Sequence, residues 1–418
     1  MTEVISQRRI RTMDTALRER ARAVIPGGMY GHLSVNTLPA EYPQFYQRAD
    51  GAHVWDVDGN EYVDFMCSFG PILLGHQHPK VEQAAAAQRA LGNTMSGPGA
   101  VMVELAELLT GRVAHADWAI FAKNGTDATT VSLMVARAAT GRPTVLAAAG
   151  AYHGAVPWFS RGRAGVTPQD HANFRYYRYN DIASVQRAVE EGGGDDVAAI
   201  IVSPFRHDAG LDQEMVRPEF ARQLRELCDR IGAALVMDEV RAGFRVHDGG
   251  SWEPIGVAPD LSAWSKAIAN GYPLAAVLGS APYAEAAARI FVTGSFWFQS
   301  VPMAAAVATI TAVREEGAVP AMIRTGTLLR EGLDREAAQA GVPISQTGPV
   351  QIPNLSFPGD ENHARAFAFC AAAADHGVIF HPRHNWFLSA AHTESDIERA
   401  LTAARAGLRA VRERFGQD

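Results

Sequence analysis

The sequence predicts an α/β protein with a large domain on a mostly parallel sheet and a smaller α+β domain. Between about residue 100 and residue 310, apolar runs of strand length alternate with longer helical patterns, which favours a parallel sheet covered on both faces. The chain has 418 residues, more than the roughly 250 to 300 at which one hydrophobic core stops growing. We therefore expect residues 1–60 to form an N-terminal arm and part of a small domain, 61–310 a large domain, and 311–418 the C-terminal small domain.

The first expected elements are a polar helix near residues 14–23 and a hairpin further along the chain. A Pro-Gly-Gly break at Pro26 separates this helix from an irregular stretch. HVWDVDGNEYVDF then contains two alternating apolar runs about an Asp58-Gly59 turn, which is a strong hairpin signal.

Five apolar runs are expected as strands of the large domain: WAIFA, TVLAAAG, VAAIIVSP, AALVMDEV and LAAVLGS. ATTVSLMVARAAT and PEFARQLRELCDRIG are helical patterns between them, and the run EEGGGDD predicts an exposed loop at 190–196. Beyond residue 310, MIRTGTLLREGLDREAAQAG and ESDIERALTAARAGLRAVRERF predict long helices that flank short apolar runs. Ligands of such parallel sheets bind at the carboxyl ends of the strands.

Charge, targeting signals and cysteines argue against several classes of protein. A formal net charge of −7 and a pI near 6.1 provide no broad basic surface, so we expect no nucleic-acid partner. The sequence has no stretch of about 18 uncharged apolar residues and no apolar run after its basic start, so we expect no membrane partner and a cytoplasmic location. Cys67, Cys228 and Cys370 are too widely spaced for a metal motif and are expected to be buried; His76 and His78 lack accompanying ligands, so we expect no metal.

The first informative motif is FAKNGTDATT, where an apolar strand ends in a polar turn and a helix begins at once. Backbone N–H groups at Gly125 and Thr126, aided by the Thr126 hydroxyl, would form an anion site at the helix N-terminus. The alternative is that Asn124 or Thr126 simply caps the helix.

The second motif is AALVMDEVRAGFR, in which Asp238 and Glu239 follow a strand that should be buried in the sheet. A buried carboxylate is costly unless it has a cationic partner. That partner is either Arg241 or Arg245 in a structural ion pair, or the protonated ring nitrogen of a bound cofactor.

The third motif is DLSAWSKAIANGYPLAAVLG, whose lysine, Lys266, stands among apolar and small residues. Lysines are usually solvated on the surface. A partly desolvated amine with a lowered pKa would instead suit Schiff-base chemistry. An anion cradle, an aspartate and a lysine on successive β-α units form the set that a pyridine-aldehyde phosphate requires.

Several motifs in the same order carry a resemblance that runs from about Pro26 to the C-terminus: VWDVDGNEYVDF, GPILLGHQHP, KNGTDAT, AYHG, MDEVRAGFR, SKAIANGYP and FLSAAHTESDI. The chain resembles the class III, or subgroup II, aminotransferases, in the branch of glutamate-1-semialdehyde aminomutase and the β-amino-acid aminotransferases. The resemblance implies the type I fold of pyridoxal-phosphate-dependent transferases, a large domain that binds pyridoxal 5'-phosphate, and a homodimer with shared active sites.

The resemblance also implies a role for individual residues. Lys266 would bind the cofactor as a Schiff base and transfer protons, and Asp238 would pair with the ring nitrogen. The other cofactor-binding residues would be Gly125 and Thr126 at the phosphate, Tyr152 and His153 of AYHG with Tyr152 stacked on the ring, Val240 on the opposite ring face, and Ser295, with Thr293 nearby, at the partner subunit's phosphate.

The chain departs from the family pattern at positions that bear on the substrate. Ser34 stands about where the aminomutases have a carboxylate-binding arginine, and Ser203 replaces an acidic residue before proline. Arg241 stands where many relatives have a neutral residue, and Arg383 resembles the arginine that β-amino-acid enzymes present to a carboxylate, the alternatives being an ion pair and a surface salt bridge. Aromatic residues, among them Tyr30 and Trp297, crowd the expected substrate pocket unless they only pack in the core.

The sequence therefore predicts an aminotransferase that moves an amino group between an amino acid or amine and a keto compound. An intramolecular aminomutase uses the same machinery and is the first alternative. A non-catalytic protein on the same fold is the second, from which the cradle, Asp238 and Lys266 would have been expected to disappear.

Overall fold

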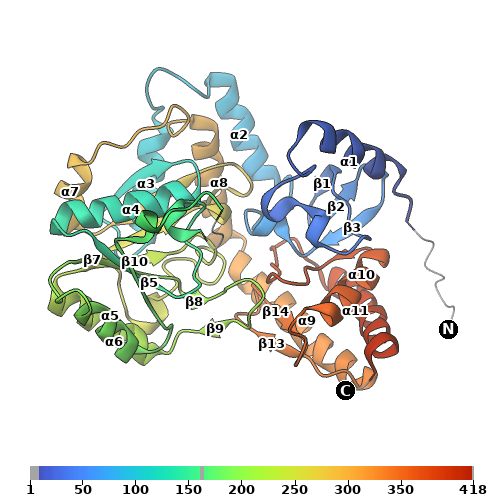
Figure 1. Cartoon of the computed structure of the whole chain (residues 1–418). Helices are drawn as coiled ribbons and strands as arrows, with labels where there is room; N and C mark the ends of the chain where they lie inside the picture. Colours follow the sequence, from blue (N-terminus) through green and yellow to red (C-terminus); the bar gives the residue numbers. More distant parts are fainter. Residues whose placement is uncertain (1–8, 161–163, 417–418) are drawn as a thin grey trace. The chain divides into compact units, whose positions relative to one another are not determined.

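The computed structural model describes residues 9–160 and 164–416, and the first eight residues of the expected N-terminal arm lie outside it. The chain divides into two compact units, which we describe separately (Figure 1). The sheet unit comprises Pro79–Asp208 and Gln213–Val319, and the terminal unit comprises the described residues of Met1–His78, Ala209–Asp212 and Pro320–Asp418. The expected domain division after residues 60 and 310 stays a prediction.

A seven-stranded sheet forms the centre of the sheet unit, in the order β4-β12-β11-β10-β7-β5-β6. The expected α/β architecture with a mostly parallel sheet is confirmed, but LAAVLGS forms β12, which runs antiparallel to both of its neighbours. The strands span Trp118–Ala122 (β4), Thr144–Ala148 (β5), Phe174–Tyr177 (β6), Val197–Val202 (β7), Ala234–Asp238 (β10), Leu261–Trp264 (β11) and Ala275–Gly279 (β12). Two short strands outside this sheet, β8 (Phe205–Arg206) and β9 (Glu214–Met215), pair with each other.

Helices cover both faces of this sheet because its central strands are apolar on both sides. Ile201 and Val236 face the core around α4 (Gly125–Thr140) and α7 (Ala284–Arg289). Ile200 and Leu235 face the core around α5 (Ile182–Glu190) and α6 (Pro218–Ile231). Figure 1 shows α4 on one side of the strands and α5 and α6 on the other. The helices α2 (Pro79–Leu91), α3 (Val101–Arg112) and α8 (Ser300–Glu315) pack together in the same unit.

The terminal unit contains a four-stranded sheet in the order β1-β2-β3-β15. The expected hairpin is confirmed: β2 (His53–Asp56) and β3 (Glu61–Asp64) pair antiparallel across the Asp58-Gly59 turn. The remaining strands are β1 (Tyr46–Asp50), β15 (Val378–Ile379) and the pair β13 (Ser345–Thr347) and β14 (Asn354–Ser356). The helices are α1 (Thr12–Val24), α9 (Ala318–Ala340), α10 (Ala364–Asp375) and α11 (Glu394–Phe415). Within the described ranges, no helix is long and apolar enough to cross a membrane.

His53 connects the hairpin of the terminal unit to the start of α11. Its Nδ1 lies 2.9 Å from Glu61 Oε1 and its Nε2 lies 2.8 Å from Asp396 Oδ1. Asp396 also closes a capping box, because it accepts hydrogen bonds from the N–H and hydroxyl of Thr393. Burial alone would raise the pKa of Asp396, but the Thr393 hydrogen bonds and the charge of His53 lower it below its ordinary value.

Replacing Asp396 by Asn is expected to lower the free energy of unfolding by about 1–2 kcal/mol at pH 7, because the substitution removes a charged cap and the His53 contact. The folded-state pKa of Asp396 is depressed, so its stabilisation is complete above the unfolded-state pKa of about 4 and is lost as the pH falls through the folded-state value. Denaturant unfolding should show the difference from wild type shrinking as the pH is lowered from 7 towards 3. Glu398→Gln, an exposed change on the same helix, is the control; equal effects of both substitutions would contradict this account.

Candidate active site

The predicted cofactor residues of the sheet unit gather at the carboxyl ends of its parallel strands. Gly125 and Thr126 follow β4, Asp238 ends β10, and Lys266 follows β11. β10 and β11 are neighbours, with Asp238 paired to Ala263 and the N–H of Glu239 bonded to the Ala263 carbonyl at 2.9 Å. The sheet therefore places the aspartate and the lysine at one edge, where parallel sheets bind ligands.

The start of α4 is compatible with both interpretations of the KNGTDAT motif, a helix cap and an anion site. Asn124 caps the helix in a reciprocal capping box with Asp127, so the capping role expected for Asn124 is confirmed. Within residues 9–160 and 164–416, however, no group accepts a hydrogen bond from the backbone N–H of Gly125 or Thr126. The cap therefore leaves two donors at the positive end of the helix dipole, where an anion is stabilised.

Two glycines allow the surrounding chain to approach this helix start closely. A Cβ built on Gly125 would lie 2.7 Å from Val240 Cγ1. Gly154 has a φ of +127°, and a Cβ there would lie 3.0 Å from Thr126. The Thr126 hydroxyl accepts the N–H of Ala155 at 3.0 Å, which joins the AYHG segment to the cradle.

Asp238 is 5% exposed, and His153 meets it in the interior. His153 Nδ1 lies 2.7 Å from Asp238 Oδ2, and the N–H of Val240 donates to Oδ1 at 3.0 Å. The hydroxyl of Thr129 on α4 donates to the His153 carbonyl at 2.6 Å. His153 is 1% exposed, and its Nε2 has no hydrogen-bond partner in the described part of the protein. This geometry fixes the carboxylate at the edge of the sheet.

Lys266 begins a short 3-10 helix, Lys266–Ala269, with a left-handed φ of +47°. Such a conformation is uncommon for a residue other than glycine and is often found at functional sites. Burial lowers the pKa of Lys266 well below its ordinary value; Arg241 and Arg245 lower it further, while Asp238 opposes them. The amine is therefore held in an environment that favours its neutral, nucleophilic form.

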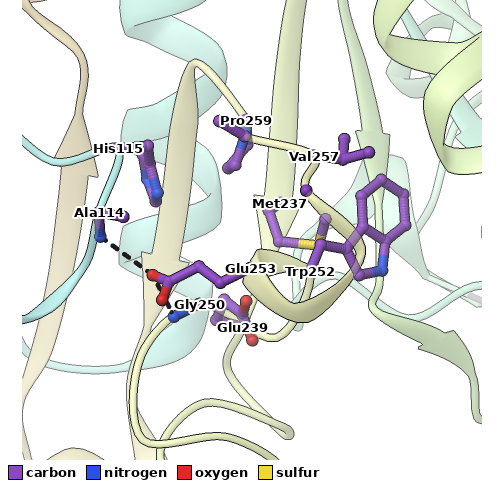
Figure 2. Close-up of a pocket in the computed structure, with 11 residues that line it drawn as sticks. Ala114, His115, Met237, Glu239, Gly250, Trp252, Glu253, Val257 and Pro259 are labelled. Atoms are coloured by element: carbon purple, nitrogen blue, oxygen red, sulfur yellow. Dashed lines mark hydrogen bonds between the residues drawn. The ribbon is translucent and has the colours of Figure 1, made fainter.

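Glu239, the other carboxylate of the MDEV motif, belongs to different surroundings. It lines a hollow of about 220 Å³ together with Met237. Met237 precedes Asp238 on β10, and because successive side chains of a strand point to opposite faces, these two side chains lie on opposite sides of the strand. Burial raises the pKa of Glu239 to about 7, and hydrogen bonds from the N–H and hydroxyl of Ser251 oppose this rise. Figure 2 shows the hollow, in which Glu253 accepts hydrogen bonds from the N–H groups of Ala114 and Gly250.

Tyr152 is 46% exposed next to this cluster. Burial raises its pKa, Arg241 opposes the rise and Asp238 adds to it. His207, just after β8, was not singled out from the sequence. Burial lowers its pKa well below the ordinary value, and the charges of Arg241 and Lys266 lower it further. The IVSPFRHD segment gives no sign that His207 lies close to Arg241 and Lys266, because the family pattern marks only Ser203 in this segment.

The remaining predicted residues lie on the loop before α8 or in the other unit. Ser295 and Thr293 are exposed on the loop before α8, and Trp297 of the same loop is partly buried against the core of the sheet unit. Tyr30 and Arg383 belong to the terminal unit, where both are exposed. The Arg383 guanidinium lies 5.0 Å from the ring centre of Phe367.

The cysteines and histidines considered as metal ligands have other surroundings. Cys67, Cys228 and Cys370 are all buried, as expected, and form no disulfide with one another. His76 Nε2 lies 3.0 Å from Asp64 Oδ2 in the terminal unit. Among the described residues, no group of three or more His, Cys, Asp or Glu side chains is arranged to hold a metal ion.

Pyridoxal phosphate fits the chemistry of these groups. The two free N–H donors at the start of α4 suit its phosphate, and the buried Asp238 carboxylate suits a protonated ring nitrogen. The desolvated amine of Lys266 suits its aldehyde.

Comparisons with known proteins agree with this fit. A model of the family Aminotransferase class-III matches residues 37–393. The chain is 50% identical over 404 residues to the aminopentol aminotransferase of Sphingopyxis macrogoltabida, covering 97% of this chain and 96% of that protein. It is 33% identical over 421 residues to the glutamate-1-semialdehyde 2,1-aminomutase of Desulfatibacillum aliphaticivorans, covering 93% and 97%. The solved FumI protein of Sphingopyxis sp. MTA144, in its PLP internal aldimine form, matches with a TM-score of 0.95 and 49% identity over 97% of each chain.

The site and the relatives lead to the same conclusion: this chain belongs to the class III aminotransferases, and it is an enzyme of the type I fold that transfers amino groups between small molecules with pyridoxal phosphate as its cofactor.

Proposed function

We propose that Lys266 is the residue that carries the cofactor and moves the substrate proton. The observation that carries this proposal is the buried Asp238 carboxylate, which His153 holds in place. Asp238 ends β10, and Lys266 follows the neighbouring strand β11. The chain holds three lysines. Lys80 is exposed and pairs with Glu315 and Glu316. Burial lowers the pKa of both Lys123 and Lys266, but it is Lys266 that interacts with the buried Asp238 carboxylate.

Each remaining residue of the cluster has a binding role in this proposal. Gly125 and Thr126 donate their free N–H groups to the phosphate, and Asp238, held by His153, faces the ring nitrogen. Tyr152 and Val240 cover the two faces of the ring, a role supported by the close approach of Val240 to Gly125. When bound, pyridoxal phosphate supplies an aldehyde that condenses with amines and a ring that accepts electrons. Lys266 Nζ then takes the proton from the carbon that bears the amino group, because its lowered pKa leaves it neutral.

Replacing Lys266 by Ala is expected to reduce turnover by about a thousandfold or more, because both the attachment of the cofactor and the general base are lost. Borohydride reduction of the wild-type holoenzyme, followed by peptide mass spectrometry, should place the added pyridoxyl group on Lys266. Lys80→Ala is the matched control, since Lys80 is an exposed lysine of the same unit, and it should keep both label and activity. Finding the label on Lys80 or Lys123 would overturn the assignment.

For the amino donor, we propose a primary amine that carries hydroxyl groups and needs no carboxylate. The 50% identical relative is named an aminopentol aminotransferase, and the name describes an amine with five hydroxyl groups. Ser34 supports this choice, because it stands about where a carboxylate-binding arginine is expected in the aminomutases. Amino donors of this class would use Arg241 and Trp297 of the sheet unit as pocket residues, and the expected role of Tyr30 stays a prediction.

Arg383 is proposed to serve the other half-reaction. A keto acid acceptor carries a carboxylate even when the donor does not, and a guanidinium binds carboxylates in a two-pronged geometry. Its exposure and its position over the Phe367 ring leave the charged end accessible.

Arg383→Ala is expected to raise the KM of a keto acid acceptor about tenfold to a hundredfold, because a charge-assisted contact is lost. The KM of a hydroxylated amine donor should stay close to the wild-type value. Steady-state kinetics with each substrate varied in turn measure both, and Arg409→Ala, an exposed arginine on α11, serves as the control. A rise in the KM of the donor alone would assign Arg383 to the donor and would favour an amino-acid substrate.

The enzyme is further proposed to act as a homodimer with shared active sites. Exposed apolar side chains of the sheet unit support this proposal, because isolated chains rarely leave such groups in water in clusters. Leu91 at the end of α2 is 80% exposed, and Phe291 is 87% exposed on the loop that carries Ser295. A largely apolar groove along α2, α3 and α8 has alanines Ala84, Ala87, Ala304 and Ala308 among its lining residues. The expected cytoplasmic location stays a prediction.

Leu91→Asp should shift the protein from dimer to monomer in analytical ultracentrifugation, because a charge would be buried in the interface. Cofactor content should fall together with dimer content if Ser295 completes the partner's site. Ile323→Asp on α9 is the control, an exposed apolar residue of the terminal unit. A monomeric wild type would contradict the proposal directly.

The aminomutase alternative is supported by the relatives of that name at 33% identity. The two reactions differ in one requirement, because an aminotransferase needs a separate keto acceptor for repeated turnover. Turnover of a single substrate without an acceptor would favour the aminomutase.

A further inference from the structure

Lys123 is an unusual residue in this chain. All but three of the 38 basic side chains are arginine, and Lys123 stands between the last residue of β4 and the cap of α4. Its backbone N–H donates to Asp127 Oδ2 at 3.1 Å, so its backbone is part of the structure that forms the anion cradle.

The Lys123 side chain contacts the loop Phe291–Gln299, which we call the aromatic loop. Lys123 Nζ donates to Gln299 Oε1 at 2.6 Å and lies 5.7 Å from the ring centre of Phe296. A charge-assisted hydrogen bond and a cation–π contact are therefore made by one ammonium group.

The aromatic loop is also held by contacts within itself and by a contact to Thr94. Trp297 folds back on Gly294, where a Cβ would lie 2.5 Å from the indole, and the backbone N–H of Trp297 donates to the Gly294 carbonyl at 2.9 Å. Ser295 lies in this tight turn and is exposed at its tip. The side-chain amide of Gln299 also donates to Thr94 Oγ1 at 3.1 Å. The Gln299 side chain thus makes two hydrogen bonds, one to Thr94 and one with Lys123, which precedes the cradle residues in the sequence.

We propose that Lys123 is a positioning residue for the cofactor phosphate: it holds the aromatic loop and with it Ser295, the residue proposed to complete the phosphate site of the partner subunit. This inference rests on the proposed function of Gly125, Thr126 and Ser295. Removing the ammonium leaves the free N–H donors of α4 in place but breaks its two contacts with the loop. The effect therefore falls on the phosphate and not on the ring of the cofactor.

The test compares release of two cofactors from the holoenzyme by equilibrium dialysis: pyridoxal phosphate, and pyridoxal, which lacks the phosphate. Lys123→Met removes the charge at similar length, Lys123→Arg retains a cation and donors, and Lys80→Met is the matched control. Lys123→Met should weaken pyridoxal phosphate about tenfold, the loss of one charge-assisted hydrogen bond, and leave pyridoxal binding unchanged. Lys123→Arg should recover most of the loss.

Gln299→Leu tests the same contact without changing Lys123 and should also weaken only the phosphorylated cofactor. If Lys123→Met binds pyridoxal phosphate as tightly as wild type, or loses both cofactors equally, the positioning role is wrong. A wild type that fails to bind either cofactor at Lys266 would overturn the proposed function itself, which separates the two failures.

Discussion

The contact between His153 and Asp238 is the constraint around which the site is arranged. A carboxylate at the end of a central strand is costly to bury without a partner, and His153 Nδ1 provides that partner at 2.7 Å. His153 in turn depends on Thr129 of α4, which binds its carbonyl. The ends of β5 and β10 and the first turn of α4 must therefore be in the correct positions together. The helix start proposed to bind the phosphate and the carboxylate proposed to pair with the ring nitrogen are then parts of one arrangement.

Small residues make this arrangement possible. Gly125 lets Val240 approach the first turn of α4, and Gly154 lets the AYHG segment pass against Thr126 with a left-handed backbone. An added methyl group at either position would push apart segments that carry the proposed cofactor residues. The glycines thus set the distance between the cradle and the ring site, while the charged residues set the electrostatics.

The features that could be predicted from the sequence are those that a local pattern of residues determines. The strand runs, the hairpin at Asp58-Gly59 and the cap at Asn124 follow from periodicity and turn chemistry, and Lys266 follows from its apolar context. The direction of β12 was missed, because a buried antiparallel strand has the same apolar pattern as a parallel one. The surroundings of His207 and Lys123 could not be predicted for a related reason, because their partners are far away in sequence: besides burial, Arg241 and Lys266 lower the pKa of His207, and Lys123 donates to Gln299.

The use of arginine and lysine in this chain has a physical logic. Arginine stays protonated under all ordinary conditions, so Arg241 and Arg245 are fixed charges that help to keep the Lys266 amine neutral. Lysine is a basic side chain whose charge burial can remove, and Lys266, the residue proposed to move the substrate proton, is buried in this way. An arginine at position 266 would stay positively charged and could neither attack an aldehyde nor accept a proton from carbon. The chemistry of this site therefore depends on a difference in pKa between two kinds of cation, and the buried sheet edge creates that difference.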